Sequence, residues 1–158
     1  MGVDGDLYNL VLVLHILAVI IGFGGMFIAG FYGNESRRLP AGEGLVVAQA
    51  TMKVSGQVPT VAVFAVPILG ILLVLMSDDV WQFSQAWISL SFLLYIVLMG
   101  LATGLQVPTL RKLVALRAAG GNATEVEALS KRAAVVGAIV NVLWVITLAL
   151  MVFKPGYP

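Results

Sequence analysis

The sequence contains no cysteine and a single histidine among its 158 residues. The absence of cysteine excludes disulfides, thiolate metal sites and cysteine nucleophiles. One histidine cannot complete a tetrahedral zinc site or a two-histidine heme site within one chain. Charged residues are also scarce, at 11% of the chain against roughly 25% in typical soluble domains. This composition excludes a soluble globular domain, a disordered chain and a nucleic-acid-binding protein.

Hydrophobic residues are abundant instead, at 60% of the chain, and the mean hydropathy is +1.02. Four stretches without charged residues each reach the roughly 20 residues that cross a ~30 Å hydrocarbon core. We therefore predict an all-α, four-transmembrane-helix antiparallel bundle that forms one integral membrane domain over residues 1–158. The predicted helices cover approximately residues 7–33, 54–76, 81–110 and 125–153.

The few charges are distributed unevenly among the connectors. Of the nine Lys and Arg residues, all but Lys154 fall within residues 35–53 and 111–132. The positive-inside rule places these two connectors in the cytoplasm, so both termini are expected on the non-cytoplasmic side. We predict a multi-pass protein of the bacterial cytoplasmic (inner) membrane, with Trp81 and Trp87 in the aromatic belt at its outer boundary.

The connectors carry signals for where the helices begin. The apolar run at 45–48 predicts that the second helix begins early and runs beneath the membrane before entering it. Asn122 precedes Glu125 by three residues, which fits a capping box and predicts a helix start near residue 124. The turn at 77–79 is short enough to make the second and third helices antiparallel neighbours.

Small residues follow one face of the first helix, at about 100° per residue. Such residues allow membrane helices to approach closely, so this face is expected to pack against protein rather than lipid. The predicted packing residues are Ala18, Gly22, Gly25, Ala29 and Gly33, and Asn141 extends a similar face on the last helix.

His15 lies on that same face, about 12 Å below the start of the span. Intramembrane ionisable residues are costly and often functional, so His15 is a candidate ligand for heme or a metal, or a candidate proton carrier. The alternative is a neutral histidine that is hydrogen-bonded between helices. Tyr95 lies at a matching depth in the third helix. It is a second candidate cofactor-binding residue, which either hydrogen-bonds to His15 or belongs to a polar stripe that only joins neighbouring helices.

Other polar residues and two prolines permit two interpretations each. Pro59 and Pro67 predict a bent second helix or, alternatively, a hinge or ligand notch. Five uncharged polar residues near the cytoplasmic side line a cavity or simply bond to each other. They are Gln57, Thr60, Thr103, Gln106 and Asn141.

A basic cluster follows the third predicted helix. Arg111, Lys112 and Arg117 are candidates for binding anionic lipid head groups, although the topological role of basic residues alone explains them. No residue pattern in the chain points to catalysis.

Three short motifs carry a family resemblance. They are Leu14–Val19 followed by Gly24–Phe27, Val107–Leu113, and Met151–Gly156. The chain resembles a family of small bacterial predicted integral membrane proteins with a domain of unknown function. Members of that family have four helices, a first helix with an LH…GG pattern and a KPG tail. The resemblance implies a fold and a membrane location, and no activity.

More distantly, the first helix resembles membrane proteins of the copper-resistance D type and the J-type protoporphyrinogen oxidases. In the latter, a first-helix histidine is a heme ligand and a lysine in a later helix supports the chemistry. His15 matches the first position, which implies heme or copper binding. No Lys or Arg lies inside a predicted span, so the second position is unfilled.

Two functions remain open on the sequence alone. The first is an accessory or interaction module in the lipid bilayer, with a membrane-protein partner or as a homo-oligomer. The second is a heme- or metal-binding, redox-type membrane protein that uses His15. A transporter is disfavoured because the sequence shows neither a mid-membrane charge nor a repeat.

Overall fold

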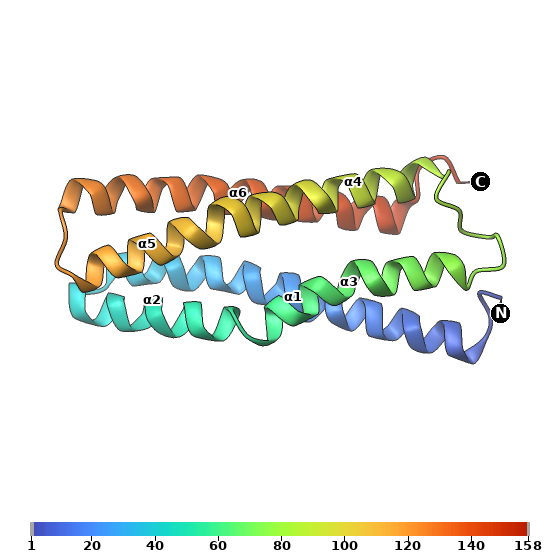
Figure 1. The fold of residues 1–158 in the computed structure, drawn as a ribbon, viewed down its shortest axis with the longest axis horizontal. Helices are drawn as coiled ribbons and strands as arrows, with labels where there is room; N and C mark the ends of the chain where they lie inside the picture. The colour runs from blue at the N-terminus through green and yellow to red at the C-terminus, as the bar shows by residue number, and fades with distance from the viewer. Residues whose placement is uncertain (1, 158) are drawn as a thin grey trace.

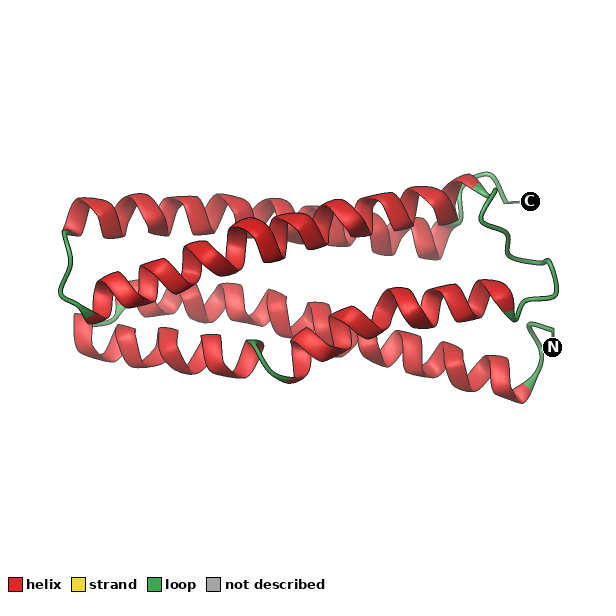
Figure 2. Ribbon diagram, viewed as in Figure 1, coloured by secondary structure: helices red, strands yellow, loops and turns green. Residues whose placement is uncertain are grey.

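A computed structural model describes residues 2–157, and these residues form helices and no strand. The helices make one elongated bundle (Figure 1), and the connectors between them are short except for the one between α3 and α4 (Figure 2). They are α1 (Asp6–Arg38), α2 (Ala41–Ser55), α3 (Val58–Leu75), α4 (Ala86–Leu101), the π-helical segment η1 (Ala102–Gln106), α5 (Val107–Ala118) and α6 (Ala123–Phe153). The prediction of an all-α fold is confirmed.

Four helical stretches are long and apolar enough to cross a membrane, which confirms the prediction of four spans. They cover Asp6–Arg38, Gly42–Leu75, Ala86–Ala118 and Ala123–Phe153. Each stretch has 31 to 34 residues, whereas about 20 residues cross the hydrocarbon core. About a third of each stretch therefore extends past that core.

Both chain ends lie at one end of the bundle, beside the connector between α3 and α4 (Figure 1). We call this the aromatic end, defined by Tyr8, Trp81, Trp87 and Tyr157. The opposite end holds the turns between α1 and α2 and between α5 and α6 (Figure 1). We call it the basic end, defined by Arg37, Arg38, Lys112, Arg117 and Lys131.

The bundle is built from two halves. In one half α1 packs along α2 and α3, and in the other half α6 packs along α4 and α5. A core of buried apolar residues joins the halves, with Phe23 stacked on Trp144 at a centroid distance of 5.6 Å. The turn predicted at 77–79 belongs to a longer connector, because α4 begins only at Ala86. The main neighbour of α3 is therefore α1 rather than α4.

The helix that leads into the second span begins at Ala41, before residue 54 and early, as the apolar run at 45–48 predicts. It does not lie across the end of the bundle, as the expected path beneath the membrane would require. Instead α2 runs alongside α1 and continues in line with α3 (Figure 1). Gly44 permits this path, because any Cβ there would collide with the Ser36 carbonyl of α1.

Two local signals shape the other helix boundaries. A turn at Gly56 and Gln57 separates α2 from α3, and Pro59 stands in the first turn of α3, a position where a missing N–H costs little. α6 begins at Ala123, where the Asn122 side chain caps the helix by accepting a hydrogen bond from the Thr124 N–H at 2.8 Å.

Candidate functional site

His15 lies where α1 faces α3 and α4. A Cβ added at Gly70 of α3 would sit 3.4 Å from His15 Cε1 and 4.0 Å from Phe92 Cζ of α4. The ring also interacts with the backbone of Val66, but this leaves Nδ1 buried without a hydrogen-bond partner among the described residues. A buried polar atom without a partner is costly, so His15 Nδ1 calls for a functional explanation.

Tyr95 does not bond to His15, so that interpretation is wrong, and it joins two helices instead. Its hydroxyl donates to the Val63 carbonyl of α3 at 2.6 Å. Pro67 explains the choice, because it has no N–H and so cannot bond to the carbonyl four residues earlier, which is that of Val63. Tyr95 supplies the missing donor from a neighbouring helix, as membrane helices with internal prolines require.

The small-residue face of α1 lies against α3 over part of its length. A Cβ added at Gly22 would lie 2.7 Å from Val63 Cγ2, and one added at Gly25 would lie 2.7 Å from Pro59 Cγ. Ala18 is buried and Ala29 is half-buried. A Cβ added at Gly33 would meet nothing within 4 Å. Close approach therefore holds α1 and α3 together between Ala18 and Gly25, just below His15.

The uncharged polar residues are not gathered around one cavity. Thr60 donates to the Ser55 carbonyl, five residues earlier, and Thr103 donates to the Met99 carbonyl, four residues earlier. Gln57 is exposed. Gln106, the last residue of η1, faces Gly137 of α6, where an added Cβ would lie 3.2 Å from Nε2. Its Oε1 is buried without a hydrogen-bond partner in the described part of the chain. Asn141 follows one turn further along α6 and is half-buried.

The structure draws attention to a glycine pair that the sequence analysis passed over. Gly100 and Gly104 are four residues apart in α4 and η1, and both are exposed. A Cβ added at either position would meet nothing within 4 Å. The signal in the sequence is the G-x-x-x-G spacing inside an apolar span, which is typical of a helix–helix association face.

The described residues do not offer a metal centre. Within residues 2–157, no group of three or more His, Cys, Asp or Glu side chains is placed to hold a metal ion. One imidazole does not complete a copper site. The ring lies close to the backbone of α3, where a Cβ added at Gly70 would lie 3.8 Å from Nδ1. The donors around Nδ1 in a single chain therefore do not complete a heme or copper site. Such a site would need a further ligand from another chain.

The candidate lipid-binding residues are divided between two environments. Arg111 is exposed, and Lys112 Nζ pairs with Glu125 of α6 at 3.0 Å. Arg117 turns into the bundle instead, where Nη1 donates to Ser36 of α1 and Nη2 donates to Ser130 of α6, both at 3.4 Å. The three side chains do not form one surface patch.

The aromatic end ties three distant parts of the chain together. Trp81 Nε1 donates to the Tyr8 hydroxyl at 2.9 Å, and the Trp81 ring lies 5.0 Å from that of Tyr157. Lys154 Nζ lies 4.2 Å from the centroid of the Trp81 ring, within the range of a cation–π interaction. Trp87 packs edge-on against Trp81 at 5.4 Å.

Comparison with known proteins identifies one family. The model of the family described as "Predicted integral membrane protein (DUF2269)" matches residues 9–155. No curated protein and no solved structure shows significant similarity to the chain.

Proposed function

The chain belongs to this family of predicted integral membrane proteins of unknown function, and on that premise we propose that it is an interaction module of the membrane. In this role the chain performs no catalysis and assembles with a second copy of itself or with another membrane protein. The resemblance drawn from the LH…GG and KPG motifs is confirmed by the family match, and the assembly is our proposal.

The open glycine pair carries this proposal. In lipid, helices associate through close van der Waals packing at small residues rather than through a hydrophobic driving force. Gly22 and Gly25 are already used inside the chain, where Val63 and Pro59 press against them. Gly100 and Gly104 offer the same kind of surface with no neighbour in the chain. A helix of a second protein fits this surface.

The association test replaces each open glycine with a bulky residue. In lipid vesicles that hold protein labelled with donor and acceptor dyes, Gly100→Ile and Gly104→Ile are expected to reduce energy transfer to the level of random mixing. Gly30→Ile is the matched control, because Gly30 is also open but lies in α1. Unchanged transfer in both α4–η1 variants, or equal loss in the control, would overturn the proposal.

We further propose that the protein resides in the bacterial cytoplasmic membrane with the aromatic end outside. The concentration of Arg and Lys at the basic end supports this orientation. A reporter enzyme that works only in the periplasm is expected to be active when it is fused after residue 158. If instead a reporter that works only in the cytoplasm is active at this position, the proposed orientation is wrong.

A second candidate function rests on the unpartnered Nδ1 of His15. In this proposal, His15 binds heme or a metal together with a ligand from a second chain, and the buried nitrogen gains its partner on assembly. Purified protein would then show a Soret band or stoichiometric metal, and His15→Ala would lose it. Wild-type protein that contains neither after expression with heme and copper supplied would overturn this function.

A further inference from the structure

The Arg117 guanidinium is held by weak contacts in a partly buried position. It reaches from α5 to Ser36 and Ser130, which are only 4% and 7% exposed. Both hydrogen bonds measure 3.4 Å, longer than the roughly 2.7–3.2 Å of ordinary N–H···O bonds. The two serines therefore position the guanidinium from the protein side and leave most of its five N–H donors for another group.

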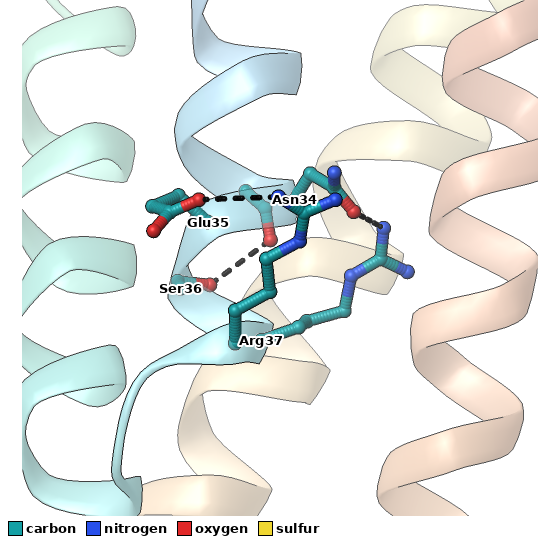
Figure 3. Close-up of polar contacts among 6 residues, drawn as sticks. Asn34, Glu35, Ser36 and Arg37 are labelled. Carbon is teal, nitrogen blue, oxygen red and sulfur yellow. Dashed lines mark hydrogen bonds and ion pairs between the residues drawn. The ribbon is translucent and has the colours of Figure 1, made fainter.

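No carboxylate within residues 2–157 forms an ion pair with Arg117 or Arg37. The charge that acts on Arg117 most directly is the positive charge of Arg37, whose Nη2 donates to Asn34 at the end of α1 (Figure 3). The ion pairs among residues 2–157 join Glu35 to Arg38, Glu125 to Lys112 and Glu127 to Lys131, so none reaches Arg37 or Arg117. Two like charges without a counter-ion indicate a site for an anion.

On α1 and α6 the serines of the site lie just past the last exposed large apolar residues. Along α6, the exposed large apolar residues end at Val135, which is 60% exposed. Ser130 lies five residues closer to the basic end, which is about 7.5 Å along the helix axis. The polar head-group layer occupies roughly 5–7 Å on each side of the hydrocarbon core. Tyr32 is the last exposed large apolar side chain of α1, four residues before Ser36, so both helices place the site at this level.

We propose that Arg117 and Arg37 bind the phosphate group of an anionic phospholipid at the basic end, while Ser36 and Ser130 hold the Arg117 guanidinium in place. The planar guanidinium of Arg117 presents paired N–H donors that match two phosphate oxygens. Arg37 adds a second charge from α1. Because the site joins α1, α5 and α6, a bound phosphate links both halves of the bundle. Arg111, which is exposed, and Lys112, which pairs with Glu125, lie outside this site.

The test measures retained lipid by native mass spectrometry of the full chain in detergent. Wild-type protein is expected to keep one phosphatidylglycerol per chain and to release phosphatidylcholine. Arg117→Gln is expected to lower phosphatidylglycerol retention about tenfold, and Arg37→Gln about fivefold. Arg111→Gln is the matched control, since it removes the same charge from the same helix, and its retention should stay within about twofold of wild type.

Three results would overturn the site: equal retention of both lipids, equal loss in Arg37→Gln and Arg111→Gln, or displacement of the lipid by millimolar inorganic phosphate. The last result would assign the site to free phosphate instead of a lipid. Arg37 is exposed, so Arg37→Gln tests the site even if Arg117→Gln fails to fold. Circular dichroism of each variant checks the fold. None of these results depends on whether the glycine pair mediates assembly.

Discussion

The two ends of the bundle differ in the groups that contact their basic side chains. At the aromatic end, Lys154 lies over the face of Trp81, and Trp81 is itself bonded to Tyr8. At the basic end, Arg117 is held by two long bonds to serines and lies near Arg37. Lys154 therefore has an aromatic partner within the chain, whereas Arg117 has no ion-pair partner among residues 2–157.

This difference separates a structural end from a binding end. Aromatic rings hold a cation without adding an opposite charge, so Lys154 has its contact within the aromatic end. Serine hydroxyls position a guanidinium without neutralising it, so the basic end keeps its positive charge. Substitutions at the aromatic end should therefore change the stability of the bundle, and substitutions at Arg117 should change what the bundle binds.

The largest effect is expected at the centre of the aromatic end. Trp81→Ala removes the bond to Tyr8, the ring contact with Tyr157 and the surface beneath Lys154. We expect a loss of about 3 kcal/mol in the free energy of unfolding, measured by denaturant titration in micelles. Trp81→Phe keeps a ring and should recover about half of that loss. A loss below about 0.5 kcal/mol in Trp81→Ala would show that the aromatic end does not stabilise the bundle.

A smaller effect is expected between the two ends, at the bond from Tyr95 to the Val63 carbonyl. Tyr95→Phe should cost about 1–2 kcal/mol in the free energy of unfolding, because it leaves a buried carbonyl without a donor. In a Pro67→Ala background the helix supplies its own N–H, so Tyr95→Phe should cost much less. Equal costs in both backgrounds would show that Tyr95 does not compensate for the proline.

Removing the cation at each end sharpens the comparison. Lys154→Gln should lower the free energy of unfolding by about 0.5–1 kcal/mol in lipid-free micelles. In the same micelles, Arg117→Gln should lower the free energy of unfolding by less than Lys154→Gln does, because the bonds from Arg117 to the serines are long. When phosphatidylglycerol is added, Arg117→Gln should have the larger effect of the two. A melting series with and without the lipid measures both effects.

The smallest effect is expected at the exposed pair of Lys112 and Glu125. Lys112→Gln breaks a 3.0 Å ion pair in which both side chains are largely exposed. We expect a change of about 0.5 kcal/mol or less in the free energy of unfolding. The change should also shrink at high salt, because screening weakens exposed charge pairs.

Hydropathy alone predicts the four spans, because twenty apolar residues in lipid have no stable alternative to a helix. The hydrogen-bond partner of Tyr95 could have been predicted from the sequence. Pro67 stands four residues after Val63 and leaves the Val63 carbonyl without its helical donor. The G-x-x-x-G spacing of Gly100 and Gly104 was equally visible. What remained hidden is how residues from different helices meet.

Arg117 shows why the rest was not predictable. Read along the chain, it belongs with Arg111 and Lys112 in one basic cluster. Its inward direction depends on buried serines of α1 and α6, which are 81 and 13 residues away. A long flexible side chain takes its direction from such tertiary contacts, and local sequence does not encode them.

The π-helical segment η1 has a consequence for changes in chain length. A π turn spans five residues where an α turn spans four, so Ala102–Gln106 holds one residue more than a regular helix needs. Deleting the codon for Leu105 should convert this turn to regular helix and leave α4 and α5 on their present faces. In genetic terms, η1 marks the position in this span where a one-residue deletion is best tolerated.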